Sequence, residues 1–205
     1  MGPYYLSALV TLLGPVASVQ ATGQIGFEER IVTTAGSPAQ GQSIKVETLT
    51  NVHALLDFAS GAHVMFLASW DVWKHGVPPI ELHGQKASLR LPDPNWFGGD
   101  LLIAGKDEDW RKIHTDSKTF GKKNWPATGR KFANARGLGL ADMARAIIDG
   151  RPHRASGDIA LHVLAVMAGI LEAATEGRRT PIALRCERPI ALGEADAKGL
   201  SRRGP

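Results

Sequence analysis

VHALLDF at residues 52–58 and HVMFLASWDV at residues 63–72 are two apolar runs separated by the tetrapeptide ASGA. A short connection containing glycine between two runs of strand-forming residues predicts a β-hairpin. Residues 80–83 and 87–91 repeat this arrangement around Gly84. The centre of the chain is therefore predicted to be a series of antiparallel strands.

The second run places apolar residues on both faces of its strand. Because successive side chains of a strand point to opposite faces, one face carries Val64, Phe66, Ala68 and Trp70, and the other carries Met65, Leu67 and Ser69. A sheet that is apolar on both faces needs two covers. We expect helices of the chain to form one cover and a partner subunit or domain to form the other.

Four further strands are predicted at residues 16–22, 44–50, 101–104 and 180–184, where β-forming residues cluster. The stretch from Ala35 to Ser43 is rich in Gly, Ser, Pro and Gln and is predicted to be a loop. Between Pro92 and Arg136 the sequence shows neither a helical nor a strand pattern, except for the short strand predicted at 101–104. A long irregular segment in a compact domain is typical of a functional or mobile loop.

The chain starts with MGPYYLSALVTLLGPV, in which Pro3 suits the first turn of a helix and Gly14-Pro15 suits its end. One buried face is predicted from residues at helical spacing, namely Leu6, Leu9, Val10 and Leu13. No Ser, Thr, Asp or Asn precedes Pro3 as a cap. We therefore expect this sequence to be a fragment of a longer protein.

Two more helices are predicted near the end of the chain. The first covers residues 138–148, and the second follows the capping residue Ser156 and ends at Gly177. The second helix has an apolar stripe, consisting of Ile159, Val163, Val166, Met167, Ile170, Leu171 and Ala174. We predict one domain over residues 1–192 and a flexible tail over residues 193–205.

Composition and charge exclude several classes of function. The 205 residues are 43% hydrophobic and 21% charged, which is ordinary for one globular domain. The net charge is +4, but the Lys and Arg residues between Lys106 and Arg154 are interspersed with acidic ones, so we expect no nucleic-acid partner. This basic region is instead predicted to be a solvated loop or a surface that faces an anionic ligand. The single Cys186 excludes an internal disulfide and fits a reducing cytoplasm.

Signatures of secretion, membrane insertion, metal binding and dinucleotide binding are also missing from the sequence. No Lys or Arg precedes Arg30, which argues against a secretion signal. The first apolar run is shorter than the roughly 20 residues that span a membrane. The seven histidines lack metal-ligand spacing, so no metal is expected. Gly137 and Gly139 resemble a dinucleotide-binding turn, but a polar segment precedes them instead of a strand. The residues alone thus predict a soluble, cytoplasmic α+β domain without an assigned reaction.

Four segments in order resemble one family: MGPYYLSALVTLLGPV, TNVHALLDFASGAHVMFLASWDVW, PPIELHGQKASLRLPDPNWFGG and RGLGLADMARAIIDGRPHRASGDIALHVLAVMAGILEAATEGRR. The family is the Gfo/Idh/MocA oxidoreductases, and the resemblance is to their C-terminal domain. It implies an α+β fold with a large, mostly antiparallel open sheet and helices on one face. It also implies that NAD or NADP binds to a separate N-terminal Rossmann domain, that the catalytic lysine lies near the junction of the two domains and is absent from this chain, and that this chain alone binds neither cofactor.

The resemblance also suggests site residues. Tyr4 falls where many members carry histidine, and a tyrosine hydroxyl can orient a substrate or relay a proton; simple packing is the alternative. Tyr5 points about 100° away on the helix and is expected to be structural. Trp96 and His162 are candidate substrate-binding residues, with Trp110 and Trp125 as further aromatic residues for stacking on a sugar. For His162 a core or interface role is the alternative, and for the tryptophans simple packing.

Two functions remain open at this stage. The first is the substrate-binding and oligomerisation part of an NAD(P)-dependent oxidoreductase that acts on a sugar, cyclitol or related hydroxyl compound. The second is a non-catalytic binding or assembly module that self-associates through the open sheet. In both cases we expect a homo-oligomer formed through the sheet face.

Overall fold

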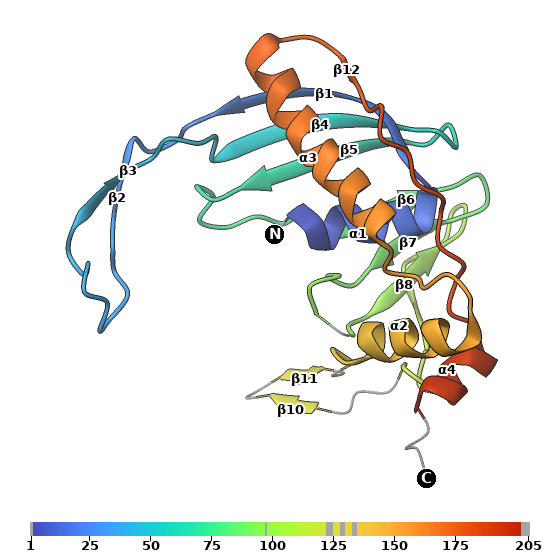
Figure 1. Ribbon diagram of the computed structural model, residues 1–205. Helices are drawn as coiled ribbons and strands as arrows, with labels where there is room; N and C mark the ends of the chain where they lie inside the picture. Colours follow the sequence, from blue (N-terminus) through green and yellow to red (C-terminus); the bar gives the residue numbers. More distant parts are fainter. Residues whose placement is uncertain (1, 97, 122–124, 128–129, 133–134, 202–205) are drawn as a thin grey trace.

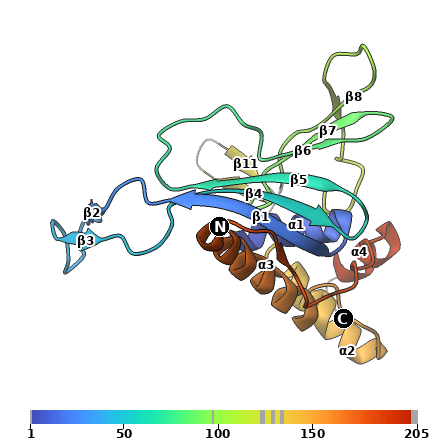
Figure 2. The same ribbon diagram turned by 90° about the horizontal axis from the view of Figure 1, so that it is seen from above.

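The computed structural model describes all residues except 1, 97, 122–124, 128–129, 133–134 and 202–205 (Figure 1). It has α+β architecture, with antiparallel sheets and helices gathered on one side (Figure 2). Its helices are α1 (Gly2–Leu13), α2 (Leu138–Asp149), α3 (Gly157–Glu176) and α4 (Glu194–Ser201). The α+β fold class predicted from the sequence is confirmed.

The first sheet has the strand order β12-β1-β4-β5. Its strands are β1 (Val16–Gln24), β4 (Asn51–Phe58), β5 (His63–Ser69) and β12 (Thr180–Pro181). The hairpin of β4 and β5 is the one predicted from the two apolar runs, with Leu55 opposite Met65 and Leu56 opposite Val64. Strand β12 is shorter than the predicted 180–184, and it ends at Pro181, which has no N–H to donate to a ladder.

The second sheet has the order β6-β7-β8-β9, and Figure 1 shows β6 to β8 below β5. Its strands are β6 (Ile80–His83), β7 (Ser88–Leu91), β8 (Leu101–Ala104) and β9 (Arg111–Ile113). Strands β6 and β7 form the second predicted hairpin. Further along the chain, β10 (Trp125–Ala127) and β11 (Arg130–Phe132) pair with each other.

The core lies between the first sheet and helices α1 and α3. In β4 the buried residues alternate, with Val52, Ala54, Leu56 and Phe58 facing the helices. Helix α3 packs closely on the sheet at Gly169, where an added Cβ would lie 3.5 Å from Cγ2 of Val19 in β1 and 2.6 Å from Cδ1 of Ile182, the residue after β12. By length and composition α3 could cross a membrane, but here it is a core helix, with Val163, Val166 and Ile170 buried against the sheet.

The opposite face of the first sheet is exposed and partly apolar. The outward residues Leu55, Met65 and Leu67 are 51%, 72% and 48% exposed. The alternation predicted for β5 is therefore confirmed, because Val64, Phe66 and Ala68 are half-buried on the helix-covered side. The chain itself covers one face of this sheet and leaves the other open.

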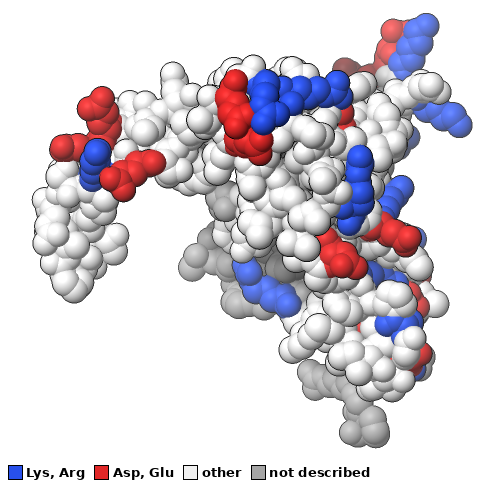
Figure 3. Space-filling view, turned by 45° about the horizontal axis from the view of Figure 1, so that its top comes forward, with Lys and Arg blue, Asp and Glu red and all other residues white. Residues whose placement is uncertain are grey.

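Residues 25–49 form an arm that projects beyond the ends of β1 and β4 (Figures 1 and 3). Its strands β2 (Glu29–Ile31) and β3 (Ser43–Lys45) pair with each other, and none of its residues is buried. The strand predicted at 44–50 is thus reduced to β3 and belongs to the arm. Its base is fixed by the side chain of Asp71, which accepts hydrogen bonds from Thr50, at 2.5 Å, and from Arg30.

Residues 194–201, which the sequence suggested were part of a flexible tail, form α4. Ala197 is buried, and Asp196 accepts a hydrogen bond from Arg154 at 2.5 Å. Arg154 also binds the buried carboxylate of Asp142 in α2. These ion pairs hold α4 against α2, and a sequence pattern of apolar residues does not reveal them.

Candidate functional site

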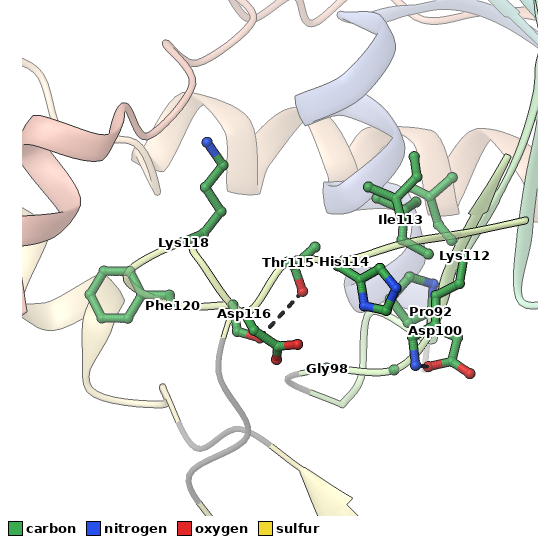
Figure 4. Close-up of a pocket in the computed structure, with 14 residues that line it drawn as sticks. Pro92, Gly98, Asp100, Lys112, Ile113, His114, Thr115, Asp116, Lys118 and Phe120 are labelled. Carbon is green, nitrogen blue, oxygen red and sulfur yellow. Dashed lines mark hydrogen bonds and ion pairs between the residues drawn. The ribbon is translucent and has the colours of Figure 1, made fainter.

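A pocket of about 540 Å³ opens where strands β8 and β9 meet the loop that follows β9 (Figure 4). Its size lies within the usual range for small-molecule sites, roughly 300–1,000 Å³. The lining residues are Leu91, Pro92, Gly98, Gly99, Asp100, Leu101, Lys112, Ile113, His114, Thr115, Asp116, Lys118, Phe120 and Gly121. This set combines hydrogen-bonding and charged groups with apolar ones.

The loop of residues 114–121 is closed on itself and tied to α4. The hydroxyl of Thr115 donates to the carbonyl of Gly121 at 3.3 Å, and the backbone N–H of Lys118 donates to the carbonyl of Thr115 at 2.9 Å. Glu194 at the start of α4 accepts from the hydroxyl of Thr119 at 2.5 Å, and also from its backbone N–H. The hydrogen bond from Thr119 keeps the pKa of Glu194 below its ordinary value. The wall of the pocket that residues 114–121 form is therefore held by hydrogen bonds within this loop and to Glu194.

An ion pair lies in the opposite wall. The Nζ atom of Lys112 is 2.6 Å from Oδ1 of Asp100, and both side chains are about half exposed. The hydrogen bond to Asp100 raises the pKa of Lys112. The ammonium group therefore stays charged and engaged within the wall.

The pocket wall is connected to α1 through Asp93, the residue after Pro92. The hydroxyl of Tyr5 donates to Oδ1 of Asp93 at 3.0 Å, and the backbone N–H of Asn95 donates to the same oxygen at 2.9 Å. Burial raises the pKa of Tyr5, and the hydrogen bond to Asp93 raises it further. Tyr5 thus ties the first helix to the segment that forms the pocket, consistent with the expected structural role.

Tyr4 lies in the first turn of α1 and is 48% exposed. Within the described part of the chain, no group forms a hydrogen bond with its hydroxyl. The Tyr4 hydroxyl is therefore open to a substrate or to another protein segment.

The tryptophans predicted for sugar stacking have different surroundings. Trp96 is 45% exposed, and its backbone N–H donates to the carbonyl of Asp93 at 3.0 Å. Trp110 lies under the guanidinium of Arg90, at 4.1 Å from the ring centroid, so this ring packs within the protein. The side chain of Trp125 falls outside the described residues.

His162 lies in the core instead of a pocket. It is fully buried in α3, and its Nε2 accepts from the backbone N–H of Val16 at 3.0 Å. Its Nδ1 donates to the carbonyl of Leu184 at 2.6 Å. Both ring nitrogens are used, which matches the core alternative, so we leave His162 out of the proposed site.

The sequence pattern did not single out Lys112, His114 or Asp116 as pocket residues. They belong to the irregular region between 92 and 136, which was predicted only in general terms as a functional or mobile loop. No motif signals them, because they come together only when β9 and its loop fold against residues 91–101. Among the described residues, no group of His, Cys, Asp and Glu side chains is arranged to hold a metal.

Residues 1–90 match the family model described as GFO/IDH/MocA C-terminal domain. The resemblance inferred from the sequence is thereby confirmed for this part of the chain. No curated protein matches the sequence at a significant level.

Solved structures share the fold over most of the chain. Levoglucosan dehydrogenase in its apo form is 19% identical, with a TM-score of 0.72 over 91% of this chain and 51% of its own. Its complex with NADH and levoglucosan is 18% identical, with a TM-score of 0.68 over 90% of this chain and 50% of its own. An NAD binding oxidoreductase from Klebsiella pneumoniae is 20% identical, with a TM-score of 0.65 over 89% of this chain and 49% of its own. The chain spans about half the length of these proteins.

Proposed function

From the match of residues 1–90 to the GFO/IDH/MocA C-terminal domain, we propose that the chain is the substrate-binding part of an NAD(P)-dependent oxidoreductase. Its substrate is a sugar, a cyclitol or a related hydroxyl compound. The observation that carries this proposal is that a sugar dehydrogenase, solved with NADH and levoglucosan, shares the fold over 90% of the chain.

In this proposal Tyr4 contacts the substrate. Its hydroxyl is exposed at the start of α1, and a tyrosine hydroxyl can donate a hydrogen bond to a substrate oxygen or pass on a proton. Trp96 offers an exposed aromatic ring on which the apolar face of a sugar can stack. The pocket beside β8 and β9, whose lining includes neither Tyr4 nor Trp96, is the other place in this proposal where charged and hydrogen-bonding groups can bind hydroxyls.

The cofactor is NAD or NADP, and it binds to a nucleotide-binding domain outside this chain. A nicotinamide dinucleotide needs a strand followed by a glycine-rich turn at a helix N-terminus. In the described residues, the strand that precedes helix α2 is β11, which pairs antiparallel with β10 in a separate two-stranded sheet, whereas the dinucleotide-binding turn belongs to a parallel sheet. Fluorescence titration of the chain with NADH should therefore show no saturation in the micromolar range.

The reading frame upstream of Met1 provides the direct test of the enzyme. We expect an in-frame strand followed by Gly-x-Gly, and a Glu-Lys-Pro segment after it. A protein that includes this region should reduce NAD+ or NADP+ with at least one member of a panel of sugars and cyclitols. Absence of both sequence features, or no reduction with any panel member, would contradict the proposal.

A second function is favoured by the exposed apolar residues of the first sheet, Leu55, Met65 and Leu67. In this alternative the chain is an assembly module that associates with a second copy through this face, because exposed apolar patches mark interaction sites. Size exclusion with light scattering should show a dimer or larger oligomer that the change Met65→Lys dissociates. A monomeric wild-type protein would exclude this role. For both functions we propose a cytoplasmic location.

A further inference from the structure

Helix α2 turns its apolar side outward. Its buried residues are Asp142 and Ala146, which lie one turn apart. In contrast, Leu140, Ile147 and Ile148 are 66%, 72% and 77% exposed. At about 100° per residue, these three side chains lie on the side of the helix opposite the buried pair. A surface helix of a globular protein normally has the reverse arrangement, with its apolar stripe toward the core.

The buried carboxylate of Asp142 fixes this orientation of α2. It accepts hydrogen bonds from the backbone N–H of Arg154 at 2.9 Å and from the guanidinium of Arg151 at 3.2 Å. It also forms an ion pair with the guanidinium of Arg154. Turning the apolar side of α2 inward would break these interactions, and breaking a buried ion pair is strongly destabilising. The outward apolar side is therefore a fixed feature of the fold.

The exposed side of α2 has a shape that fits a second copy of itself. Leu140, Ala144 and Ile148 are spaced four residues apart and form one ridge, with the small residue at its centre and a large one at each end. Two helices that pack through ridges of this spacing cross at about −50°, and the side chains at the crossing point set the distance between them. In a two-fold contact with Ala144 at the crossing point, the backbones can approach closely and Leu140 of one copy would lie beside Ile148 of the second copy.

No charged side chain of α2 opposes such a contact. Besides the buried Asp142, the charged residues of this helix are Arg145 and Asp149, which pair with each other at 2.9 Å away from the ridge. In a two-fold contact the same patch is used on both copies, so a net charge within the patch would be repelled by itself. The ridge and the adjacent Ile147 are uncharged, which favours a second copy over a charged partner.

Figure 2 shows α2 on the helical side of the molecule, away from the open face of the first sheet. We propose that α2 is a separate docking surface, which binds α2 of a second copy of this chain through the ridge of Leu140, Ala144 and Ile148. The contact is independent of the open sheet face and of the oxidoreductase proposal. Because a helix of 12 residues is about 18 Å long, the contact is smaller than the roughly 800 Å² per partner of a standard interface. The resulting dimer is therefore weak.

Analytical ultracentrifugation of the 205-residue chain tests the proposal. All proteins carry Met65→Lys, so that the open sheet face does not contribute to association. The chain should dimerise with a dissociation constant above about 1 µM, as expected for an interface below standard size. A monomer at every concentration up to about 1 mM would overturn the proposal. Protection of α2 from hydrogen exchange in a monomeric longer protein would assign the surface to another segment and would also overturn it.

Two substitutions on the ridge and one control locate the contact. Ala144→Arg and Ile148→Lys place an unpaired charge in the contact and should each weaken dimerisation at least about tenfold. Both positions are exposed, so the circular dichroism spectrum should stay unchanged. Leu171→Lys makes the same kind of change at a 44% exposed position of α3 and should leave the dissociation constant unchanged. Equal weakening by all three substitutions, or none by Ala144→Arg, would overturn the assignment.

A cross-link tests the crossing point itself. Ala144→Cys places two thiols at the two-fold axis, where the backbones come close enough for the roughly 4.4–6.8 Å between Cα atoms that a disulfide requires. Leu171→Cys is the control, and both variants carry Cys186→Ala to remove the native thiol. Oxidised glutathione should convert Ala144→Cys, but not Leu171→Cys, into a disulfide-linked dimer on a non-reducing gel. A dimer that forms without this cross-link would overturn the crossing at Ala144.

Discussion

His162 in the middle of α3 accepts a hydrogen bond at Nε2 from the backbone N–H of Val16, the first residue of β1, at 3.0 Å. The opposite side of the ring donates to the carbonyl of Leu184. One buried imidazole therefore joins the long helix to two separate parts of the chain. A backbone N–H and a carbonyl that would otherwise be buried without partners are both satisfied by it.

Replacing this histidine should destabilise the fold. His162→Phe keeps the volume of the ring roughly but leaves the Val16 N–H and the Leu184 carbonyl unpaired, at a cost of about 1–3 kcal/mol for each group. The free energy of unfolding, measured in urea, should fall by about 3 kcal/mol. His162→Gln, whose amide can both donate and accept, should recover part of the loss, and the exposed Leu161→Gln should change little. Equal stability of His162→Phe and wild type would show that these hydrogen bonds do not matter.

The two tyrosines of α1 should give opposite results when each loses its hydroxyl. In the protein that reduces the coenzyme, Tyr4→Phe should lower kcat by about 100-fold, the lower range for a group that transfers a proton, and leave stability unchanged because Tyr4 is 48% exposed. Tyr5→Phe should cost about 1 kcal/mol of stability, since the hydrogen bond to Asp93 is lost, with a small effect on kcat. Steady-state kinetics and urea unfolding of both variants check this. A normal kcat for Tyr4→Phe would leave packing as its role.

The sequence was sufficient to predict the parts of the fold that depend on local periodicity. The β4–β5 hairpin follows from alternation around a glycine-containing turn, and α3 follows from its cap at Ser156 and its apolar stripe. Helix α4 was not predicted, because its attachment depends on ion pairs between residues distant in sequence, such as Arg154 and Asp196. A local sequence pattern does not show which distant residues will pair.

The candidate site was less predictable for the same reason. Tyr4 and Trp96 are exposed and their roles toward a substrate remain predictions, whereas His162 is a core residue. An isolated histidine on an apolar helix has the same sequence pattern in either role, and only its two backbone partners distinguish them. His114 and Asp116 lie in a region without periodicity, and their shared pocket results from tertiary contacts.

The ion pairs of Asp142 should make stability depend on pH in the acid range. Burial disfavours the charged form of this carboxylate, but the backbone N–H of Arg154, at 2.9 Å, and the guanidinium of Arg151, at 3.2 Å, outweigh burial and hold the pKa below its ordinary value. A lowered pKa in the folded state stabilises the protein above the unfolded pKa of about 3.9, and this contribution is lost as the pH falls through the folded value.

The test of this linkage is Asp142→Asn. At pH 7 it should lower the free energy of unfolding by about 3 kcal/mol, as expected when one partner of a buried ion pair is removed, and the fall of stability below pH 4 should become shallower. Glu172→Gln is the control, because its pair with Arg178 is exposed and does not involve Asp142, Arg151 or Arg154, and it should contribute less than about 1 kcal/mol. Urea unfolding between pH 2.5 and pH 7 measures both variants, and identical pH profiles for wild type and Asp142→Asn would contradict the assignment.

Alanine at two helical glycines should have effects of opposite sign. An added Cβ at Gly169 would lie 2.6 Å from Cδ1 of Ile182, which is itself buried between α3 and the sheet. Overpacking of this kind costs about 1–3 kcal/mol, more than the gain of about 1 kcal/mol in helix propensity, so Gly169→Ala should destabilise the protein. Gly139 in α2 has no atom within 4 Å of an added Cβ, so Gly139→Ala should stabilise it by the propensity gain alone. Thermal unfolding of the two variants separates the cost of overpacking from the gain in helix propensity. A rise in Tm for Gly169→Ala would mean that Ile182 moves aside at little cost in free energy.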